Sequence, residues 1–355
     1  MLKHLFLENF RNYKKYSLDF NKTTILVGPN GIGKTNLIEA IYLLSTGRSW
    51  RTRRDSEVVF WQKDFARIII KTTNDKELVL EMVIQQIPNP DYPQLKLIKI
   101  NGLKKRLTDL LGKLPMVLFS PEEIQLLDGP PVLRRRVLDI LLCQLDRKYT
   151  LALLDLGKII RGRNRLLYFI KIGKSQIKEL TFWDEKLVTL GSFIINKRLK
   201  TLEVLNKNIS QIYQTISGMD EELKIKYKES VRPENFSETL FSHREQEIEN
   251  TATLFGPHRD DLVFLLLGKN ITTFGSRGEY RSAILALKVA ELEYLKKESD
   301  RVPILLLDDI FSELDKNRRL HLNKIIEESQ TIITTTDLHQ IEENLRKKAK
   351  IIELK

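Results

Sequence analysis

The clearest hydrophobic pattern in the sequence is a short apolar run, a glycine-rich loop and an amphipathic segment in direct succession. Thr23–Val27 contains only β-branched and apolar residues, which predicts a buried strand. Residues 36–44 then repeat apolar side chains at helical spacing. Between them lie three glycines, at positions 28, 31 and 33. The pattern therefore predicts a strand, a tight loop and a helix.

Up to about residue 117 the remaining pattern is mostly that of strands. Strands are predicted at 2–10, 16–20, 66–71, 78–84, 96–100 and 114–119. The first alternates only in part and is expected at a sheet edge. A turn is predicted at 73–76, and Pro88, Pro90 and Pro93 predict a loop. The pair Asn101-Gly102 favours a type I′ hairpin.

Beyond residue 117 helical patterns dominate. One runs from about 131 to 172, where Gly173 is expected to end it, and another from about 176 to 216. The apolar stripe of the second slips at 197–202, so a sustained coiled-coil heptad is not expected. Strands resume at 223–227 and 302–307. We expect an α/β fold with one lobe formed by 1–116 and 291–355 and a mainly helical lobe formed by 117–290.

Composition adds information on partners and compartment. The 355 residues include 59 Lys+Arg and 47 Asp+Glu, a formal net charge of +12, which favours a polyanionic partner. Cys143 is the only cysteine, so an intramolecular disulfide is impossible. The sequence contains neither a signal-peptide pattern nor an apolar span of about 20 residues. We expect a cytoplasmic protein without a membrane segment.

Three basic clusters are candidates for DNA contact. They are Arg51, Arg53 and Arg54; Lys104, Lys105 and Arg106; and Arg134, Arg135 and Arg136. The first follows Trp50, and arginines beside an aromatic residue suit nucleic-acid backbone contacts, although a solvated loop is the alternative. The third either forms a solvated helical edge or contacts phosphates or another subunit.

Residues 28–35 match G-x-x-x-x-G-K-[ST] at every fixed position, between a strand and a helix as this motif requires. Glycines let backbone N–H groups surround phosphate oxygens, and the helix N-terminus adds a positive dipole end. Lys34 is expected to reach the β- and γ-phosphates, and the Thr35 hydroxyl to bind Mg²⁺. The predicted ATP-binding residues are Gly28, Pro29, Asn30, Gly31, Ile32, Gly33, Lys34, Thr35 and Asn36. Arg11, in a polar turn, either contacts the nucleotide or is solvated.

A second half of the nucleotide site is predicted near the C-terminus. The apolar run 304–307 ends in Asp308 and Asp309. Ligands bind at the carboxyl ends of strands in open α/β sheets, so Asp308 is expected to hold Mg²⁺ and Asp309 to orient or deprotonate the attacking water. The phosphate loop and the acidic strand together are specific for a nucleoside triphosphate site.

Two further segments add to the phosphate loop and the acidic strand. Ser276 and Gly278 precede a helical pattern, either as an anion site or as a capping serine and a turn glycine. Asp315 follows the acidic strand in a Ser-x-x-Asp sequence. In this order the motifs resemble the ABC-type P-loop ATPase head with a mixed sheet. Segments 9–13, 28–31, 47–49, 119–122, 129–131 with 134–136, 256–261 and 307–309 are similar to those of the bacterial RecF recombination-repair family.

The resemblance implies an ATPase head and a helical lobe without long coiled-coil arms. It implies an ATP-dependent homodimer in which Ser276 and Gly278 contact the triphosphate bound by the partner copy, with Asp315 supporting the interface. It also implies weak DNA-dependent ATPase activity, binding of duplex or gapped DNA, recombinase loading with RecR and RecO, and support of replication restart and the SOS response. Glu279 and Tyr280 depart from the glutamine-rich pair of the family, and Asp309 is shorter than the glutamate of wider ABC proteins.

Two other functions compete with this interpretation. An SMC-like chromosome organiser would need long heptads between the motifs, which the sequence lacks. A P-loop small-molecule kinase would need neither Ser-x-Gly nor Ser-x-x-Asp. His258, in the polar turn 254–261, is either a structural residue or a contact to nucleotide or DNA.

Overall fold

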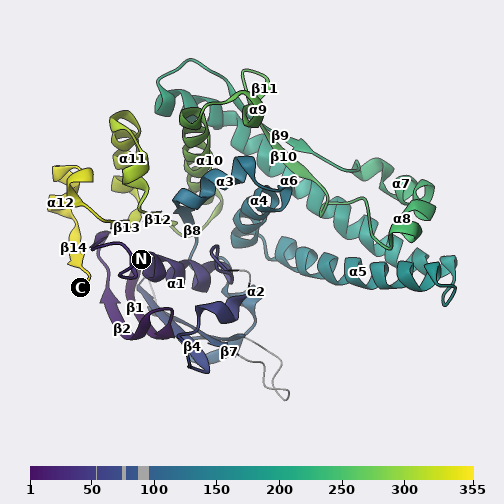
Figure 1. Cartoon of the computed structure of the whole chain (residues 1–355), viewed down its shortest axis with the longest axis horizontal. Helices are drawn as coiled ribbons and strands as arrows, with labels where there is room; N and C mark the ends of the chain where they lie inside the picture. The colour runs from purple at the N-terminus through teal and green to yellow at the C-terminus, as the bar shows by residue number, and fades with distance from the viewer. Residues whose placement is uncertain (53, 74–76, 87–95) are drawn as a thin grey trace. The chain divides into compact units, whose positions relative to one another are not determined.

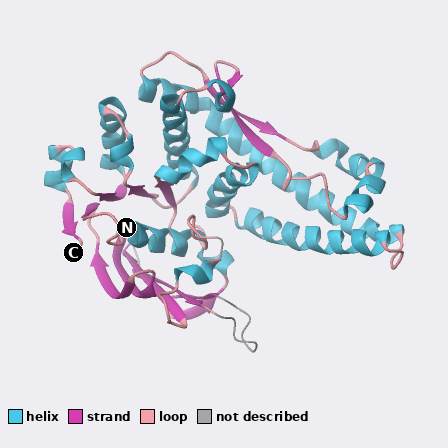
Figure 2. Cartoon of the chain, in the orientation of Figure 1, coloured by secondary structure: helices cyan, strands magenta, loops and turns pink. Residues whose placement is uncertain are grey.

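The computed structural model describes residues 1–52, 54–73, 77–86 and 96–355. The chain forms two compact units (Figure 1). The first comprises Met1–Ile124, Thr215–Met219 and Arg281–Lys355, and the second comprises Gln125–Gln214 and Asp220–Tyr280. Strands (magenta in Figure 2) dominate the first unit, whereas the second is mostly helical with a three-stranded sheet.

The first unit contains a five-stranded parallel sheet in the order β14-β3-β13-β12-β8. Its strands are β14 (Lys350–Glu353), β3 (Thr23–Val27), β13 (Gln330–Thr335), β12 (Ile304–Asp308) and β8 (Met116–Phe119). Every residue of β12, β13 and β8 is buried. Parallel strands covered on both faces carry continuous apolar runs, which is why their pattern does not alternate.

Helix α1 (Lys34–Thr46) contacts both sheets of the first unit, and ten of its thirteen residues are buried. The other helices of this unit are α2 (Leu107–Leu110), α11 (Lys316–Glu328) and α12 (Glu343–Lys348), with 3-10 turns at Asp55–Val58, Pro121–Ile124, Ile310–Glu313 and Leu338–Gln340. Because both ends of α1 are fixed by packing, the phosphate loop before it has a rigid base.

The second sheet of this unit is antiparallel, in the order β2-β1-β4-β5-β6-β7. Its strands are β1 (Leu2–Phe10), β2 (Tyr13–Asp19), β4 (Phe65–Thr73), β5 (Glu77–Gln85), β6 (Lys96–Ile100) and β7 (Leu103–Lys105). The prediction of an edge position for β1 is wrong, because β1 pairs with β2 on one side and β4 on the other. On one face of β1 Leu5 and Leu7 are buried, whereas His4 and Glu8 on the other face are only half-buried, a pattern that antiparallel sheets allow.

Two predicted turns have different outcomes. Asn101 and Gly102 adopt φ angles of 50° and 79°, which confirms the type I′ hairpin. The turn around residues 74–76 and the loop with Pro88, Pro90 and Pro93 lie outside the described residues. The expected lobe boundary at residue 117 falls inside β8, and β8 pairs with β12, so the first unit continues to Ile124.

The second unit is built on α4 (Pro131–Leu145), α5 (Arg147–Lys171) and α6 (Leu180–Ser217). The helical pattern predicted to run on to residue 172 is interrupted at Asp146, whose side chain accepts hydrogen bonds from the N–H groups of Lys148 and Tyr149 and caps α5. Gly173 ends that helix region with a φ of 71°. A Cβ atom at position 162 would collide with the Trp183 ring, so the glycine there allows α5 and α6 to approach closely.

The remaining elements of this unit are short. They are α3 (Gln125–Asp128), α7 (Phe236–Ser242), α8 (Arg244–Asn250), α9 (Ile271–Phe274), the 3-10 turns Ile177–Glu179 and Pro233–Asn235, and the strands β9 (Leu223–Lys228), β10 (Asp261–Leu266) and β11 (Lys269–Asn270). Helix α10 (Arg277–Glu298) begins in the second unit and ends in the first.

A buried arginine organises the core of the second unit. The Arg198 guanidinium donates to Asp139 at 2.8 Å, to the Tyr227 hydroxyl at 3.1 Å and to the Pro257 carbonyl at 2.7 Å. The Tyr227 hydroxyl in turn donates to Asp260 at 2.5 Å. A buried charge is tolerated only when it is paired and hydrogen-bonded, so this network fixes the position of residues 257–260.

Candidate functional site

The phosphate loop connects β3 to α1 as predicted. Gly33 occupies the N-cap of α1 with a φ of 115°, in the left-handed region that favours glycine. A Cβ atom there would lie 2.6 Å from the Asn12 amide nitrogen and 2.7 Å from the Tyr13 hydroxyl. The loop can therefore carry no side chain at this position, and its backbone is held close to the turn between β1 and β2.

Lys34 is held back against its own loop. Its Nζ donates to the carbonyls of Gly28 at 2.6 Å and Pro29 at 2.9 Å. Burial lowers the pKa of Lys34, while the carboxylates of Asp309 and Asp308 oppose that shift. An ammonium group satisfied by carbonyls can exchange these contacts for phosphate oxygens, which are stronger charged acceptors.

The acidic strand delivers Asp308 to the start of α1. The Thr35 hydroxyl donates to Asp308 Oδ1 at 2.9 Å, and the Thr334 hydroxyl donates to the same oxygen at 2.7 Å. Thr334 stands opposite Asp308 in the register of β13 and β12. The structure thus brings together the two residues predicted to hold Mg²⁺.

The carboxylates of this site are short of positive charge. Burial raises the pKa of Asp308, although the hydroxyls of Thr334 and Thr35 oppose the shift; the nearby charge of Glu122 raises the pKa further. Burial also raises the pKa of Asp309, against the effect of Lys34. Asp309 Oδ1 is buried without a hydrogen-bond partner. Desolvated carboxylates of this kind favour an incoming cation.

The donor set fits magnesium. Thr35 and Asp308 supply one hydroxyl and one carboxylate, and Mg²⁺ is usually held by one or two such protein groups together with phosphates and water. The described residues contain no group of three or more His, Cys, Asp or Glu side chains able to hold a metal.

Behind the loop, two arginines share one fully buried carboxylate. Arg11 contacts Glu39 through Nε at 2.9 Å and Nη2 at 2.6 Å, and Arg51 Nη1 lies 3.0 Å from the same side chain. Ser49 donates to Glu39 at 2.5 Å. Arg11 is expected from the sequence either to contact the nucleotide or to be solvated. Its guanidinium is held by Glu39 and does not project into solvent, which disfavours the solvated alternative.

The sequence patterns missed Glu39 because a glutamate within an otherwise apolar helix looks like a residue of its exposed face. Its buried partners come from loops before and after α1. Asn36, expected near the nucleotide, accepts from Arg51 at 2.7 Å and donates to Asn12 at 2.9 Å. Asn12 donates to the Ile32 carbonyl at 2.8 Å, which ties the β1–β2 turn to the phosphate loop.

Ser276 and Gly278 lie at the start of α10, as predicted. The Ser276 hydroxyl accepts from the Glu279 N–H at 3.3 Å, and the Glu279 carboxylate accepts from the Ser276 N–H at 2.5 Å. These reciprocal bonds form a capping box, so Glu279 has a structural role at a position where the family pattern differs. The capping interpretation and an anion site are compatible, since the helix N-terminus still presents positive dipole density.

Asp315 is the N-cap of α11. Its carboxylate accepts from the Arg318 N–H at 3.0 Å and forms an ion pair with the Arg318 guanidinium. The side chain is more than half exposed. It is therefore available for a contact in addition to capping its own helix.

The basic clusters differ in how freely their side chains face solvent. Lys104, Lys105 and Arg106 are exposed on and next to β7, and Arg54 is exposed before the 3-10 turn at Asp55–Val58. Arg51 is engaged by Glu39 and Asn36. Arg53 lies outside the described residues. Arg54 and the Lys104–Arg106 cluster therefore remain candidates for DNA contact.

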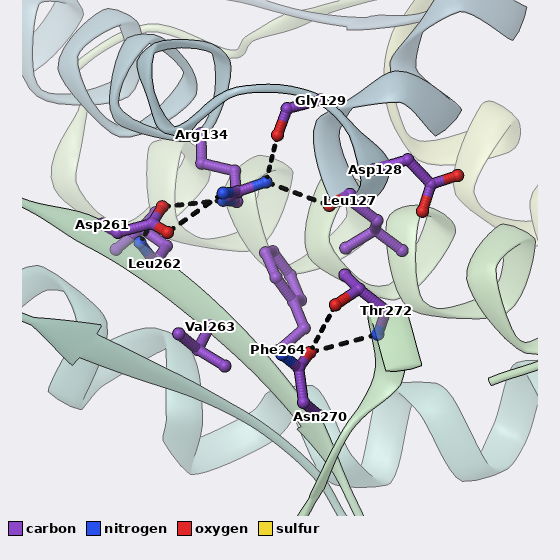
Figure 3. A pocket seen from close by; sticks show the side chains of 10 residues that line it. All are labelled: Leu127, Asp128, Gly129, Arg134, Asp261, Leu262, Val263, Phe264, Asn270 and Thr272. Carbon is purple, nitrogen blue, oxygen red and sulfur yellow. Dashed lines mark hydrogen bonds and ion pairs between the residues drawn. The ribbon is translucent and has the colours of Figure 1, made fainter. Parts of the chain in front are cut away.

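Arg134 and Arg135 of α4 have partners inside the second unit, and Figure 3 shows those of Arg134. Arg134 forms a two-pronged ion pair with Asp261 at 2.8 and 3.0 Å and also donates to the Gly129 carbonyl at 2.8 Å. Arg135 donates to the Asp260 carbonyl at 2.5 Å. Arg134, Asp261 and Gly129 line a cavity of about 360 Å³. Arg134 and Arg135 thus fix architecture, while Arg136 is partly buried and also engaged in an interaction.

His258 belongs to the same structural network. Its Nε2 lies 3.1 Å from the Thr253 carbonyl, to which Arg259 also donates. Burial lowers the pKa of His258 to about 4. A neutral histidine bonded to a backbone carbonyl within its own unit supports the structural alternative.

No helix in the described part of the chain is both long and apolar enough to cross a membrane.

Comparisons with known proteins agree over nearly the whole chain. The profile of the RecF/RecN/SMC N terminal domain matches residues 1–353. The DNA replication and repair protein RecF of Chloroflexus aurantiacus is 39% identical, covering 94% of this chain and 93% of the relative. The RecF protein of Bacillus cytotoxicus is 38% identical, covering 98% and 95%.

Solved structures show the same relationship. A recombination mediator protein RecF with ATP, described as part of the RecFOR pathway, superimposes with a TM-score of 0.89 at 35% identity, covering 96% of this chain and 93% of that one. An Smc head bound to the C-winged helix domain of ScpA has a TM-score of 0.55 at 19% identity, covering 99% and 93%, and shares the fold alone. The expected ABC-type ATPase head is confirmed. The chain belongs to the RecF family.

Proposed function

We propose that this protein is an ATP-dependent DNA-binding protein of recombinational repair whose two copies associate around bound ATP. The observation that carries the proposal is the 2.9 Å hydrogen bond from Thr35 to Asp308, which joins the phosphate loop to the acidic strand. Relatives named as DNA replication and repair proteins, and a RecF structure with ATP, support the same assignment.

Within one copy each residue of the site has a defined task. The N–H groups of the loop and Lys34 bind the β- and γ-phosphates, and Lys34 gives up the carbonyls of Gly28 and Pro29 to do so. Thr35 and Asp308 would hold Mg²⁺, which neutralises charge on the phosphate oxygens when bound. Asp309 accepts a proton from, or orients, the attacking water.

Asp309 also explains why turnover is expected to be slow. Its carboxylate is one methylene shorter than a glutamate, and its backbone is fixed in the left-handed region at φ 50° with its N–H bonded to Thr334. A base held short of the attacking water positions it poorly, and catalysis depends steeply on such distances. ATP would act as a switch, with hydrolysis stimulated by DNA.

The homodimer would complete each nucleotide cage. Ser276 and Gly278 present the N-terminus of α10, a site that favours anions, and would contact the γ-phosphate held by the other copy. Asp315 is exposed enough to join that interface. Closing two basic heads over ATP would create a surface for duplex or gapped DNA, with Arg54 and the Lys104–Arg106 cluster as candidate contacts.

RecR, with RecO, is the proposed protein partner, and recombinase loading at single-strand gaps, replication restart and SOS induction are the proposed outcomes. The related RecF with ATP is described as a recombination mediator of the RecFOR pathway, which supports this choice of partners. Measuring ATPase activity with and without DNA separates this function from that of a small-molecule kinase, which would turn over without DNA.

The decisive experiment is light scattering with Mg²⁺ and ATP on the parent chain and on Ser276→Arg. The parent is expected to dimerise, and the variant to bind ATP as a monomer but not to dimerise, because a bulky cation fills the place of the γ-phosphate contact. Ser276→Asp is a second variant that preserves the helix cap and repels the triphosphate. It should lose dimerisation as well.

Two controls make the result interpretable. Ser242→Arg introduces the same change at an exposed serine of α7 and should leave dimerisation intact. Lys34→Ala should weaken ATP binding itself, as measured by calorimetry. Full ATP-driven dimerisation of both Ser276 variants would refute the composite site, and unchanged ATP affinity of Lys34→Ala would refute the phosphate-loop assignment.

A further inference from the structure

The most exposed large apolar side chain among the described residues is Trp61, at 86% exposure. It stands in a turn closed by a hydrogen bond of 3.1 Å from the Lys63 N–H to the Phe60 carbonyl. Gln62, next in the turn, has a φ of 63°. Trp61 therefore occupies the second position of a tight turn, with its indole projecting into solvent.

The turn is braced by backbone contacts to the β1–β2 connection. The Phe60 N–H donates to the Asn9 carbonyl at 2.8 Å, the Arg11 N–H donates to the Val58 carbonyl at 2.7 Å, and Val59 forms a bridge with Phe10. The indole is thus presented by a fixed backbone. A rigid aromatic side chain loses little conformational entropy when it binds a ligand.

Two exposed lysines lie near this aromatic side chain. Lys14 Nζ lies 5.9 Å from the centre of the Phe60 ring, next to Trp61 in the sequence, and Lys63 closes the turn. Within the described chain neither lysine forms an ion pair. Of the carboxylates near the turn in sequence, Asp55 is paired with Lys96 at 2.5 Å, Glu57 accepts from the Arg54 N–H at 3.2 Å, and Asp64 is exposed next to Lys63.

Other exposed aromatic side chains differ in one respect. Phe241 and Phe274 are each 71% exposed, but Arg244 lies 5.0 Å from the ring centre of Phe241 and Lys269 lies 5.8 Å from that of Phe274. Among the described residues no ring or cation covers the indole of Trp61. Its face is free to stack.

We propose that Trp61 is a stacking platform for an unpaired base of single-stranded DNA, with Lys14 and Lys63 contacting the flanking phosphates. This combination of a bare aromatic face and unpaired cations is the one that single-strand binding proteins use. A protein partner fits less well, because lysine is depleted at protein interfaces. The inference rests on the proposed DNA binding and adds the single-stranded side of a gap to it.

The test uses the full chain with Mg²⁺ and ATP and two probes: an oligo-dT of about 30 nucleotides, longer than one platform's site, and a covalently closed duplex without unpaired bases. Tryptophan fluorescence and anisotropy of labelled DNA are recorded for the parent, Trp61→Ala, Trp61→Phe and the control Phe241→Ala. Trp61 is exposed, so these substitutions should leave the fold intact.

Oligo-dT is expected to quench the fluorescence of the parent and of Phe241→Ala but not that of Trp61→Ala. Affinity for oligo-dT should fall about 5- to 100-fold in Trp61→Ala, from the usual strength of base–aromatic stacking. Trp61→Phe should retain most of it, and duplex affinity should be unchanged in all four proteins. Lys14→Ala should instead weaken the binding of both DNA probes and make their affinity less dependent on salt concentration.

Equal oligo-dT affinity of the parent and Trp61→Ala, or parent fluorescence that oligo-dT leaves unchanged, would overturn the stacking proposal while duplex binding still stood. Trp61 quenching seen only with an added protein partner would overturn it in favour of a protein contact. Failure of the parent to bind either DNA would overturn the proposed function as well.

Discussion

The chain contains two pairs of adjacent aspartates whose surroundings differ. Asp308 and Asp309 follow a buried parallel strand and meet hydroxyl donors from Thr35 and Thr334 and the charge of Lys34. Asp260 and Asp261 open an antiparallel strand and meet the Tyr227 hydroxyl and the guanidinium of Arg134. The same dipeptide is therefore left reactive in one unit and satisfied in the other.

The difference lies in the donors. Neutral hydroxyls leave the negative charge of Asp308 largely uncompensated, which suits the proposed binding of a cation together with a triphosphate. A guanidinium matches Asp261 in charge and geometry, so nothing further is needed there. Asp260 also has neutral donors and burial raises its pKa, but both of its carboxylate oxygens accept hydrogen bonds, whereas Asp309 Oδ1 has no partner.

The largest expected effect is on the structural pair. Arg198→Ala leaves Asp139 and the Tyr227–Asp260 contact in a buried place without their cation, and should lower the free energy of unfolding by about 3–5 kcal/mol. Urea unfolding at neutral pH measures it. Arg198→Lys keeps the charge without the planar fork and should lose less. A loss below about 1 kcal/mol for alanine would show that the network does not hold this unit together.

The next test replaces one aspartate of each pair by asparagine and compares the effects on ATP binding and on stability. Asp308→Asn should weaken binding of ATP with Mg²⁺ at least about tenfold, or about 1.4 kcal/mol, with little loss of stability, because burial already disfavours its charge. Asp260→Asn should leave ATP affinity unchanged. It should cost about 1–3 kcal/mol of stability, because Tyr227 and the Ser230 N–H donate to different oxygens of Asp260 and asparagine keeps only one of them. Calorimetry and urea unfolding of both variants reveal whether either pair has been misassigned.

A pH series tests the structural motif through His258. Its pKa is lowered to about 4 in the folded chain from 6.5, so between these values the unfolded chain binds the proton and the folded chain does not. Stability should therefore rise with pH across this window. At pH 5.5 the parent should have lost about 1.4 kcal/mol relative to pH 8 from this group. His258→Gln should show a flatter profile, and identical profiles would contradict the buried neutral histidine.

The smallest effect concerns Asp315. Asp315→Ala removes the N-cap of α11 and should cost about 1 kcal/mol, whereas Asp315→Asn retains a capping oxygen and should cost only a few tenths. Light scattering with ATP then isolates the interface role. If Asp315 acts at the dimer, the asparagine variant dimerises less than the parent at equal stability. Equal dimerisation would restrict Asp315 to capping.

Much of the fold was predictable where short patterns suffice. The buried strands and α1, the Asn101-Gly102 hairpin and the serine at the start of α10 each depend on a few neighbouring residues. The interior position of β1 was not predictable, because which strands flank it depends on segments some 15 and 65 residues away. The break at Asp146 was missed, because a capping aspartate between two helical patterns is easily absorbed into one.

By itself the sequence determined the chemistry of the nucleotide site, since the loop and the acidic strand specify their own backbone geometry and the ligands they offer. Only the tertiary structure decided which charged side chains are already paired within the protein. Arg11 meets Glu39 across 28 positions and Arg134 meets Asp261 across 127, and no local pattern marks either pair. A charged side chain looks the same along the chain whether it faces solvent or a buried partner, and only packing brings the partner to it.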